Sequence, residues 1–179
     1  MKRVIKYILP ILFPLYSFAQ MKLDLRISMF DEKIEFSIPK KFGKMPKSMW
    51  EVKYRNLPMP DLVLTDPDGE INLLLNKTDN EAGENELEEY KNFRIRNLQN
   101  QRKDISILDQ GVKIVNGIKI SFFKFSSLAV DQGVFNFYFF IILEGKIVTF
   151  TFNCIRSLQK TWEKTADAIM ESVTVKKDN

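Results

Sequence analysis

Three acidic side chains that could take part in hydrolysis lie close together in the sequence, around one predicted turn. Asp66 and Asp68 lie in the segment Asp66-Pro67-Asp68-Gly69, and Asp61 precedes that segment. Two carboxylates can catalyse glycoside hydrolysis when they lie at a defined separation across the substrate. The sequence fixes no such separation, whereas Asp-Pro-Asp-Gly is typical of a tight turn between strands. A paired-acid hydrolase therefore ranks third, behind the two binding functions given below.

The same acids resemble a fragment of a calcium loop, but the rest of the loop is missing. No bidentate Glu follows at the required spacing, and Pro67 separates the two acids. The sequence also contains no histidine, which removes His-based acid–base catalysis, Ser–His and Cys–His pairs, and His metal sites. We therefore expect no enzyme activity, no metal and no cofactor.

Cys154 is the only cysteine, so the chain cannot form an intrachain disulfide. Cys154 alternates with Phe150 and Phe152, which places the thiol on the apolar face of a predicted strand. The pattern predicts a buried structural thiol and no nucleophile.

Six side chains are candidates for binding a partner or a ligand. They are aromatic or uncharged polar residues on predicted helices and strands: Trp50, Tyr54, Asn136, Thr149, Thr151 and Asn153. Trp50 and Tyr54 lie four residues apart on one side of a predicted short helix after Pro46. They would cover one end of the core or form an aromatic binding edge, and the core role is the commoner one for large aromatics.

The polar candidates lie on two neighbouring strand segments. Asn136 interrupts an otherwise apolar run, where it would be a polar handle in a pocket or a hydrogen-bond partner of a nearby loop. Thr149, Thr151 and Asn153 alternate with apolar residues and so form the polar face of a strand. An ordinary solvent-facing surface would show the same alternation.

The first 19 residues have the parts of a secretory signal. Basic Lys2, Arg3 and Lys6 precede a short apolar run, and Ser17-Phe18-Ala19 offers cleavage before Gln20. The run is shorter than the roughly 20 residues that span a bilayer, which favours cleavage over an uncleaved anchor. We expect a bacterial protein that is periplasmic or secreted and has no stable membrane span after signal removal. The Ala-Gln junction resembles those of Bacteroidetes-type secreted proteins.

Removal of the signal nearly neutralises the chain. The full sequence has 27 basic and 23 acidic residues, a net charge of +4. Three of the basic residues, and no acid, leave with the signal, so the mature chain would have a net charge of about +1. This balance predicts no nucleic-acid partner, which would require a clustered basic face.

Periodicity predicts one domain over residues 33–176, preceded by a linker over 20–32. Alternating apolar residues predict a strand over 33–38, and Asn116-Gly117 between alternating segments predicts a hairpin. The run 134–143 is apolar at both parities, as expected of a central strand covered on both faces. Apolar residues at helical spacing predict helices over 86–101 and 157–172. The resulting class is α+β, with an antiparallel sheet of about six strands flanked by helices on both faces, an α/β/α sandwich.

Several segments in order resemble the PsbP/DcrB-like superfamily. They are an FSIP strand at 36–39, an INLLLN strand at 71–76, the Asn116-Gly117 hairpin, a Glu144-Gly145-Lys146 turn, and a final FNC…W…A..IM.SV pattern over 152–173. The resemblance covers roughly residues 33–175 and implies a PsbP-like fold. That superfamily includes photosystem extrinsic subunits, small bacterial envelope proteins and effector chaperones. It has no shared catalytic set, and its members mostly bind proteins.

Two binding functions follow from these observations. The first is a non-enzymatic secreted or periplasmic module, chaperone-like or accessory-like, that binds a protein partner in the cell envelope. The alternative is a carrier of a small apolar ligand, held in a pocket between the sheet and a helix.

Overall fold

The protein is described by a computed structural model that covers residues 20–55, 57–129 and 132–176. These residues form two antiparallel sheets and three α-helices. The predicted secretory signal, residues 1–19, lies outside the described residues. Among the described helices, none is both long and apolar enough to cross a membrane.

The main sheet has seven strands. Across the sheet their order is β3 (Gly43–Lys44), β4 (Leu62–Thr65), β5 (Ile71–Glu81), β9 (Lys146–Ile155), β8 (Gly133–Leu143), β7 (Ile118–Leu128) and β6 (Ser106–Val115). Every neighbouring pair is antiparallel. The hairpin predicted at Asn116-Gly117 joins β6 to β7, and both turn residues have positive φ, 49° and 80°. These values suit the two-residue turns that match the twist of paired strands.

A second, three-stranded sheet corrects the predicted linker over residues 20–32. It has the order β1 (Leu25–Met29), β2 (Ile34–Ile38) and β10 (Thr174–Val175). Strand β1 lies within the segment that shows no clear period as a whole, yet Leu25, Ile27 and Met29 pack against the core. The strand forms because its backbone pairs with β2 from Leu25↔Ile38 to Met29↔Ile34.

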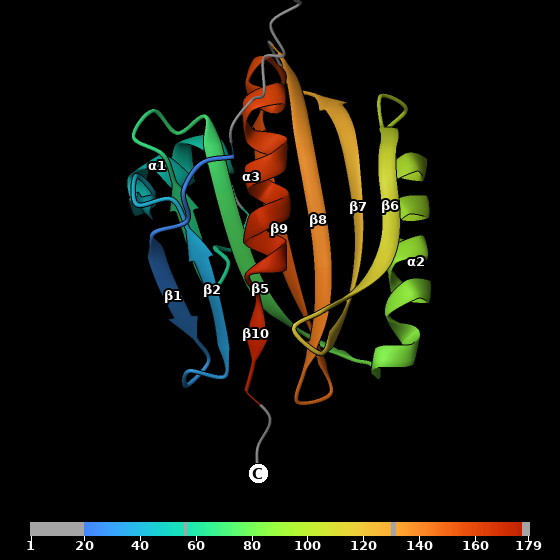
Figure 1. The fold of residues 1–179 in the computed structure, drawn as a ribbon. Helices are drawn as coiled ribbons and strands as arrows, with labels where there is room; N and C mark the ends of the chain where they lie inside the picture. Colours follow the sequence, from blue (N-terminus) through green and yellow to red (C-terminus); the bar gives the residue numbers. More distant parts are fainter. Residues whose placement is uncertain (1–19, 56, 130–131, 177–179) are drawn as a thin grey trace, which may run out of the picture.

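Helices cover both faces of the main sheet, as the predicted α/β/α sandwich requires (Figure 1). Helix α3 (Gln159–Glu171) and strand β2 pack on one face, where Trp162 and Phe36 join the large core cluster. Helix α2 (Leu87–Gln101) packs on the other face against Phe123 and Phe140 of β7 and β8. Helix α1 (Lys47–Lys53) covers the same face farther along, against Val63 of β4.

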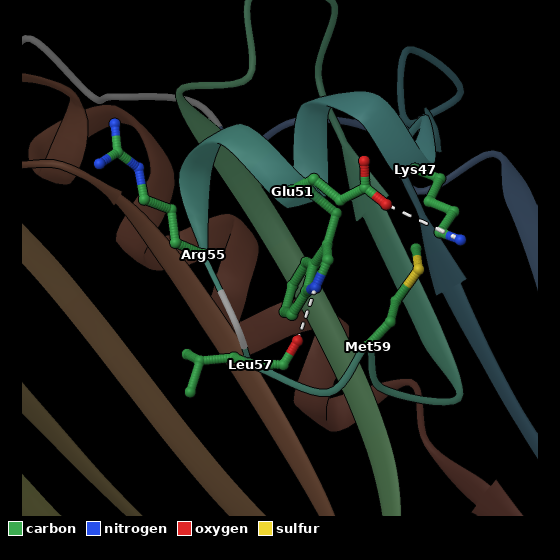
Figure 2. Close-up of a pocket in the computed structure, with 6 residues that line it drawn as sticks. Lys47, Glu51, Arg55, Leu57 and Met59 are labelled. Carbon is green, nitrogen blue, oxygen red and sulfur yellow. Dashed lines mark hydrogen bonds and ion pairs between the residues drawn. The ribbon is translucent and has the colours of Figure 1, made fainter.

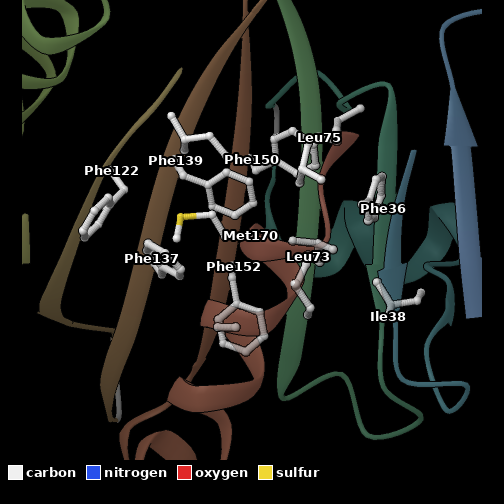
Figure 3. Packing of buried hydrophobic residues seen from close by; sticks show 14 of the residues in the cluster. Phe36, Ile38, Leu73, Leu75, Phe122, Phe137, Phe139, Phe150, Phe152 and Met170 are labelled. Atoms are coloured by element: carbon white, nitrogen blue, oxygen red, sulfur yellow. The ribbon is translucent and has the colours of Figure 1, made fainter. Parts of the chain in front are cut away.

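The core between α3 and the main sheet packs aromatic rings among aliphatic side chains (Figure 3). Phe139 of β8 and Phe150 of β9 stack with ring centroids 4.5 Å apart, and Phe36 meets Phe150 edge-on at 5.4 Å. Strand β8 is buried on both faces, as its double-sided apolar pattern predicts. The main sheet is thus held between two apolar layers. It has seven strands, where the sequence predicts about six.

Candidate functional site

A groove of about 660 Å³ lies on the face of the sheet opposite α3. Helix α1 borders it on one side, and the residues that follow α2 border it on the other (Figure 1). Its floor is formed by β5, β9, β8 and β7, which are neighbours in the sheet. The groove thus occupies the part of this face that neither helix covers.

Three asparagines form a row across the groove floor, which we call the amide row: Asn72, Asn153 and Asn136. Asn153 of β9 lies directly opposite Asn72 of β5 and opposite Asn136 of β8. Asn72 Nδ2 donates to Asn153 Oδ1 at 2.9 Å, and Asn136 Nδ2 donates to Ser127 Oγ at 3.0 Å. Asn72 and Asn136 are buried and Asn153 is half-buried, so Asn153 is the most accessible of the three.

The α1 wall is attached to this floor by Tyr54 and Lys53. The side chain of Tyr54 lies beside that of Asn153, and burial raises the pKa of Tyr54 by more than this neighbour lowers it. Its ring stacks on Trp50, with centroids 4.2 Å apart and planes 24° apart. Lys53 Nζ donates to the carbonyl of Gly69 in the β4–β5 turn. Helix α1 is therefore fixed to the sheet through side chains that also line the groove.

The opposite wall is attached through Arg102 and Asp104. Arg102 Nη2 donates to Asp104 Oδ2 and to the carbonyl of Leu128, each at 2.5 Å. Asp104 Oδ2 in turn accepts from the backbone N–H of Leu128 at 2.7 Å. These two hydrogen bonds, led by that of Arg102, lower the pKa of Asp104 to about 2. The end of β7 and the segment after α2 are thereby joined, which fixes this wall of the groove.

Exposed apolar side chains flank the polar floor. Val52 on the α1 side is 73% exposed, and Leu128 at the end of β7 is 60% exposed. Leu57 and Met59 are exposed in the segment that follows α1. An apolar rim beside uncharged donors and acceptors provides both surface to bury and hydrogen bonds to direct a bound molecule.

A second cavity, of about 510 Å³, lies on the outer side of α1 (Figure 2). Its lining includes Lys47 and Glu51, which form an exposed ion pair at 3.7 Å, and the side chain of Met59. Trp50 also lines this cavity and donates from Nε1 to the carbonyl of Leu57 at 3.1 Å. Trp50 is only 6% exposed and packs with Val63, so it serves mainly as core.

The structure brings three of the six candidate residues into the groove and leaves three outside it. Tyr54, Asn136 and Asn153 line it. Asn136 also donates a hydrogen bond to Ser127, which lies in the neighbouring strand β7 and not in a loop. Thr149 and Thr151 lie on the same face of β9 but outside the lining. Thr151 lies opposite Tyr138 of β8, whose pKa is raised mainly by burial.

Sequence reasoning missed Asn72, Ser127 and Arg102, all of which line the groove. Asn72 is the one polar residue among the first five of β5, so it resembles Asn136 in being a polar residue in a buried apolar strand. That shared pattern is the signal that could have found it. Ser127 and Arg102 have no such signal, because strand pairing and the end of α2 decide where they lie.

The acids of the hydrolase hypothesis serve the backbone instead. Asp66 is buried, and its Oδ1 accepts from the N–H of Ile71 at 2.9 Å. Asp61 Oδ2 accepts from the N–H of Lys77 at 2.7 Å. Among residues 20–55, 57–129 and 132–176, no group of three or more His, Cys, Asp or Glu residues could hold a metal ion.

The thiol of Cys154 is buried, with 1% of the residue exposed. Burial is the main reason that its pKa rises to about 12. The thiolate is the nucleophilic form of cysteine, so this thiol is inert in the folded protein.

Comparison with known proteins reveals the fold but no sequence family. No protein-family model matches the chain, and no curated protein is significantly similar to it. Among solved structures, the chain is similar to cyanobacterial PsbP (CyanoP) from Synechocystis sp. PCC 6803, with a TM-score of 0.62 and 14% identity over 92% of this chain and 99% of that one. It is also similar to LpqN of Mycobacterium tuberculosis, a protein involved in cell envelope biogenesis, with a TM-score of 0.59 and 12% identity over 86% and 90% of the two chains.

A third similar structure comes from Bacteroides thetaiotaomicron VPI-5482, with a TM-score of 0.53 and 10% identity. The likeness covers 89% of this chain but 50% of that one. At such identities these structures establish architecture alone, and a resemblance to DcrB-like proteins stays a prediction. With an antiparallel sheet held between α3 on one face and α1 and α2 on the other, the chain has the PsbP-like fold.

Proposed function

We propose that the protein is a non-enzymatic binding module of the bacterial cell envelope, periplasmic or secreted, which docks a protein partner in the groove between α1 and α2. The observation that carries the proposal is the amide row, flanked by the exposed side chains of Val52 and Leu128. The N-terminal pattern of a cleaved secretory signal supports the location.

The composition of the groove favours a protein over a small molecule. Isolated exposed apolar residues are ordinary, but here two of them, Val52 and Leu128, flank the same groove. Asparagine amides both donate and accept, so they can pair with the N–H and C=O groups of a polypeptide backbone. The charged lining residues are Lys53, Glu70 and Arg102, and Arg102 is already paired with Asp104, so the lining favours no strongly charged ligand.

The residues most suited to catalysis are already engaged in the fold, which supports a non-enzymatic role. Asp61 and Asp66 accept backbone hydrogen bonds at strand ends. Asp104 is held by Arg102, and Cys154 has a pKa raised to about 12. Each of these side chains is thus held by a contact of the fold or buried in it, which leaves none of them placed to act on a substrate.

The alternative of an apolar-ligand carrier has less support. Such a carrier needs an apolar space between the sheet and a helix. Between α2 and the sheet, Phe123 and Phe140 are fully buried, and Phe140 meets the ring of Tyr90 edge-on at 5.1 Å. Side chains thus fill the region where an apolar ligand would lie, and the groove that remains has a polar floor.

Site-specific photo-cross-linking tests the proposal. A photoreactive amino acid replaces Val52 or Leu128 at the groove, or Lys160 on α3 as a control on the opposite face of the sheet. Cells that naturally contain the protein are irradiated, and adducts are identified by mass spectrometry. We expect both groove positions to capture the same envelope protein and Lys160 to capture none.

Two outcomes would contradict the proposal. One is capture of the same proteins at all three positions, because the groove would then be no more in contact with a partner than the rest of the surface. The other is the absence of any adduct from the groove positions when the protein is at its natural abundance.

A further inference from the structure

Strand β6 is a long unpaired edge of the main sheet. It spans ten residues and is last in the strand order, whereas β3 at the other edge has two. No strand of the described residues pairs with its outer side. An edge of this length offers a row of N–H and C=O groups on which another strand can pair.

Two large apolar side chains on β6 are exposed to solvent, which is unfavourable for an edge strand that pairs with nothing. Ile114 is 68% exposed and Leu108 is 46% exposed. Helix α2 packs chiefly over β7 and β8, the strands inside this edge. A register shift between Ile107 and Asp109 marks a bulge at one end, but pairing with β7 is regular from Asp109 to Val115.

The hairpin geometry decides which backbone groups of β6 face outward. A two-residue turn at Asn116-Gly117 makes Val115 and Ile118 a hydrogen-bonded pair. Because bonding alternates along an antiparallel strand, the backbone groups of Gln110, Val112 and Ile114 point away from β7. These are the groups available to an incoming strand.

The sequence of β6 is complementary to itself. In an antiparallel pairing of two copies centred on Gly111, Asp109 of each copy lies opposite Lys113 of the other. The same register sets Gln110 opposite Val112, both of which have outward backbone groups. At the ends it brings Leu108 level with Ile114, the two exposed apolar residues. Opposite charges directly across an antiparallel pair are stabilising, and like charges are destabilising.

We propose that two copies of this chain associate through β6, which joins their main sheets about a two-fold axis. Asp109 is exposed and forms no ion pair with any other described residue, so its carboxylate can meet Lys113 of the second copy. Lys113 lies 3.8 Å from Glu171, near the limit of an ion pair, and is 47% exposed. A register centred on Val112 would place Lys113 opposite Gly111 and leave both charges without a direct partner.

A charge-swap experiment on the purified protein tests this inference. The mass in solution is measured by sedimentation equilibrium over a range of concentrations for the unchanged protein, for Asp109→Lys, and for the double variant Asp109→Lys/Lys113→Asp. Asp68→Lys makes the same charge change on an exposed turn and is the matched control. Thermal unfolding shows that each variant is folded.

The inference predicts a monomer–dimer equilibrium in the unchanged protein. Asp109→Lys sets two lysine pairs against each other across the two-fold axis, so it should weaken association at least tenfold, roughly the effect of one lost favourable contact pair. The double variant should restore association, and Asp68→Lys should leave it unchanged. A protein that stays monomeric at all concentrations, or a dimer that persists in Asp109→Lys, would overturn the inference.

Discussion

Asn72 Nδ2 lies 2.9 Å from Asn153 Oδ1, and this hydrogen bond joins β5 to β9 on the floor of the groove. Asn72 Oδ1 meanwhile accepts from Thr65 Oγ1 at 2.8 Å, so the amide of Asn72 is engaged on both sides. The side chain of Asn153 also lies beside Tyr54 of the α1 wall. Asn153 therefore lies where the groove floor meets its wall, and side-chain amides hold the floor together.

Replacement of Asn72 tests this role of the amide row in stability. Asn72→Ala deprives Thr65 and Asn153 of a buried partner, which should lower the free energy of unfolding by about 1–3 kcal/mol. Asn76→Ala, an exposed position on the same strand, is the control and should change it by less than about 0.5 kcal/mol. Urea denaturation measures both. Equal effects would mean that the amide of Asn72 does not support the fold.

The ion pairs of Lys124 tie β7 to α3 at the edge of the core. Lys124 Nζ lies 2.9 Å from Asp167 Oδ2 and 3.2 Å from Glu163 Oε1. Burial opposes the charge of Lys124, but these two carboxylates outweigh that effect and raise its pKa. Burial also raises the pKa of Asp167, and its bond to Lys124 only partly offsets the rise.

Asp167→Asn should lower the free energy of unfolding by about 1–2 kcal/mol, less than for a fully buried pair because Asp167 is partly exposed. The control is Glu51→Gln, which removes the exposed ion pair with Lys47 and should change stability by less than about 0.5 kcal/mol. Guanidinium denaturation of the two variants measures the difference. If Glu51→Gln were the more destabilising, the ion pair between Lys124 and Asp167 would not be the stabilising contact that we infer.

Acid should weaken the fold through Glu144 and Asp104. Lys33 and Lys77 hold Glu144 at the β8–β9 turn and lower its pKa to about 2. A carboxyl with a lower pKa in the folded state stabilises the protein above its unfolded pKa, and the effect is lost as pH falls through the folded pKa. The melting temperature should therefore fall between about pH 5 and about pH 2.

Glu144→Gln should make that fall smaller, because the variant has no charge to lose at this position. Thermal unfolding of both proteins across the same pH range, at low salt, measures the difference. Identical pH profiles would show that the ion pairs of Glu144 with Lys33 and Lys77 contribute nothing to stability.

Cys154 should be protected from thiol reagents while the protein is folded. Its thiol is buried, and its pKa is raised to about 12, mainly by burial. A chromogenic disulfide reagent at neutral pH should react at once with the protein in denaturant and at least about a hundredfold more slowly without it. Rapid modification of the folded protein would contradict the burial of this strand.

Much of the fold could be predicted because its strongest signals are local. Alternating apolar residues predict β2, and Asn116-Gly117 predicts the β6–β7 hairpin. The run that is apolar at both parities predicts that β8 lies in the centre of the sheet. Strand β1 was not predicted because its formation depends on pairing with β2. Strand β3 was not predicted because two residues are too few to show a periodic pattern.

Less of the groove could be predicted because distant segments form it. Asn72 and Asn153 are 81 residues apart, and only the register of β5 with β9 sets them opposite each other. Asn136 could be predicted because it interrupts an apolar run. Asn153 could be predicted because it continues the alternating polar face of Thr149 and Thr151. Arg102 was not found because its place depends on contacts with Asp104 and Leu128.

The measurement that tests the central claim most directly is the affinity of the cross-linked partner for groove variants. Val52→Asp and Leu128→Asp place a charge on the exposed rim and should leave the fold intact, while Phe93→Asp makes the same change on α2 outside the groove. Isothermal titration of the purified proteins should show binding at least about tenfold weaker for each rim variant and changed less than about twofold for Phe93→Asp. If the rim variants bound as tightly as Phe93→Asp, the groove would not be the docking site.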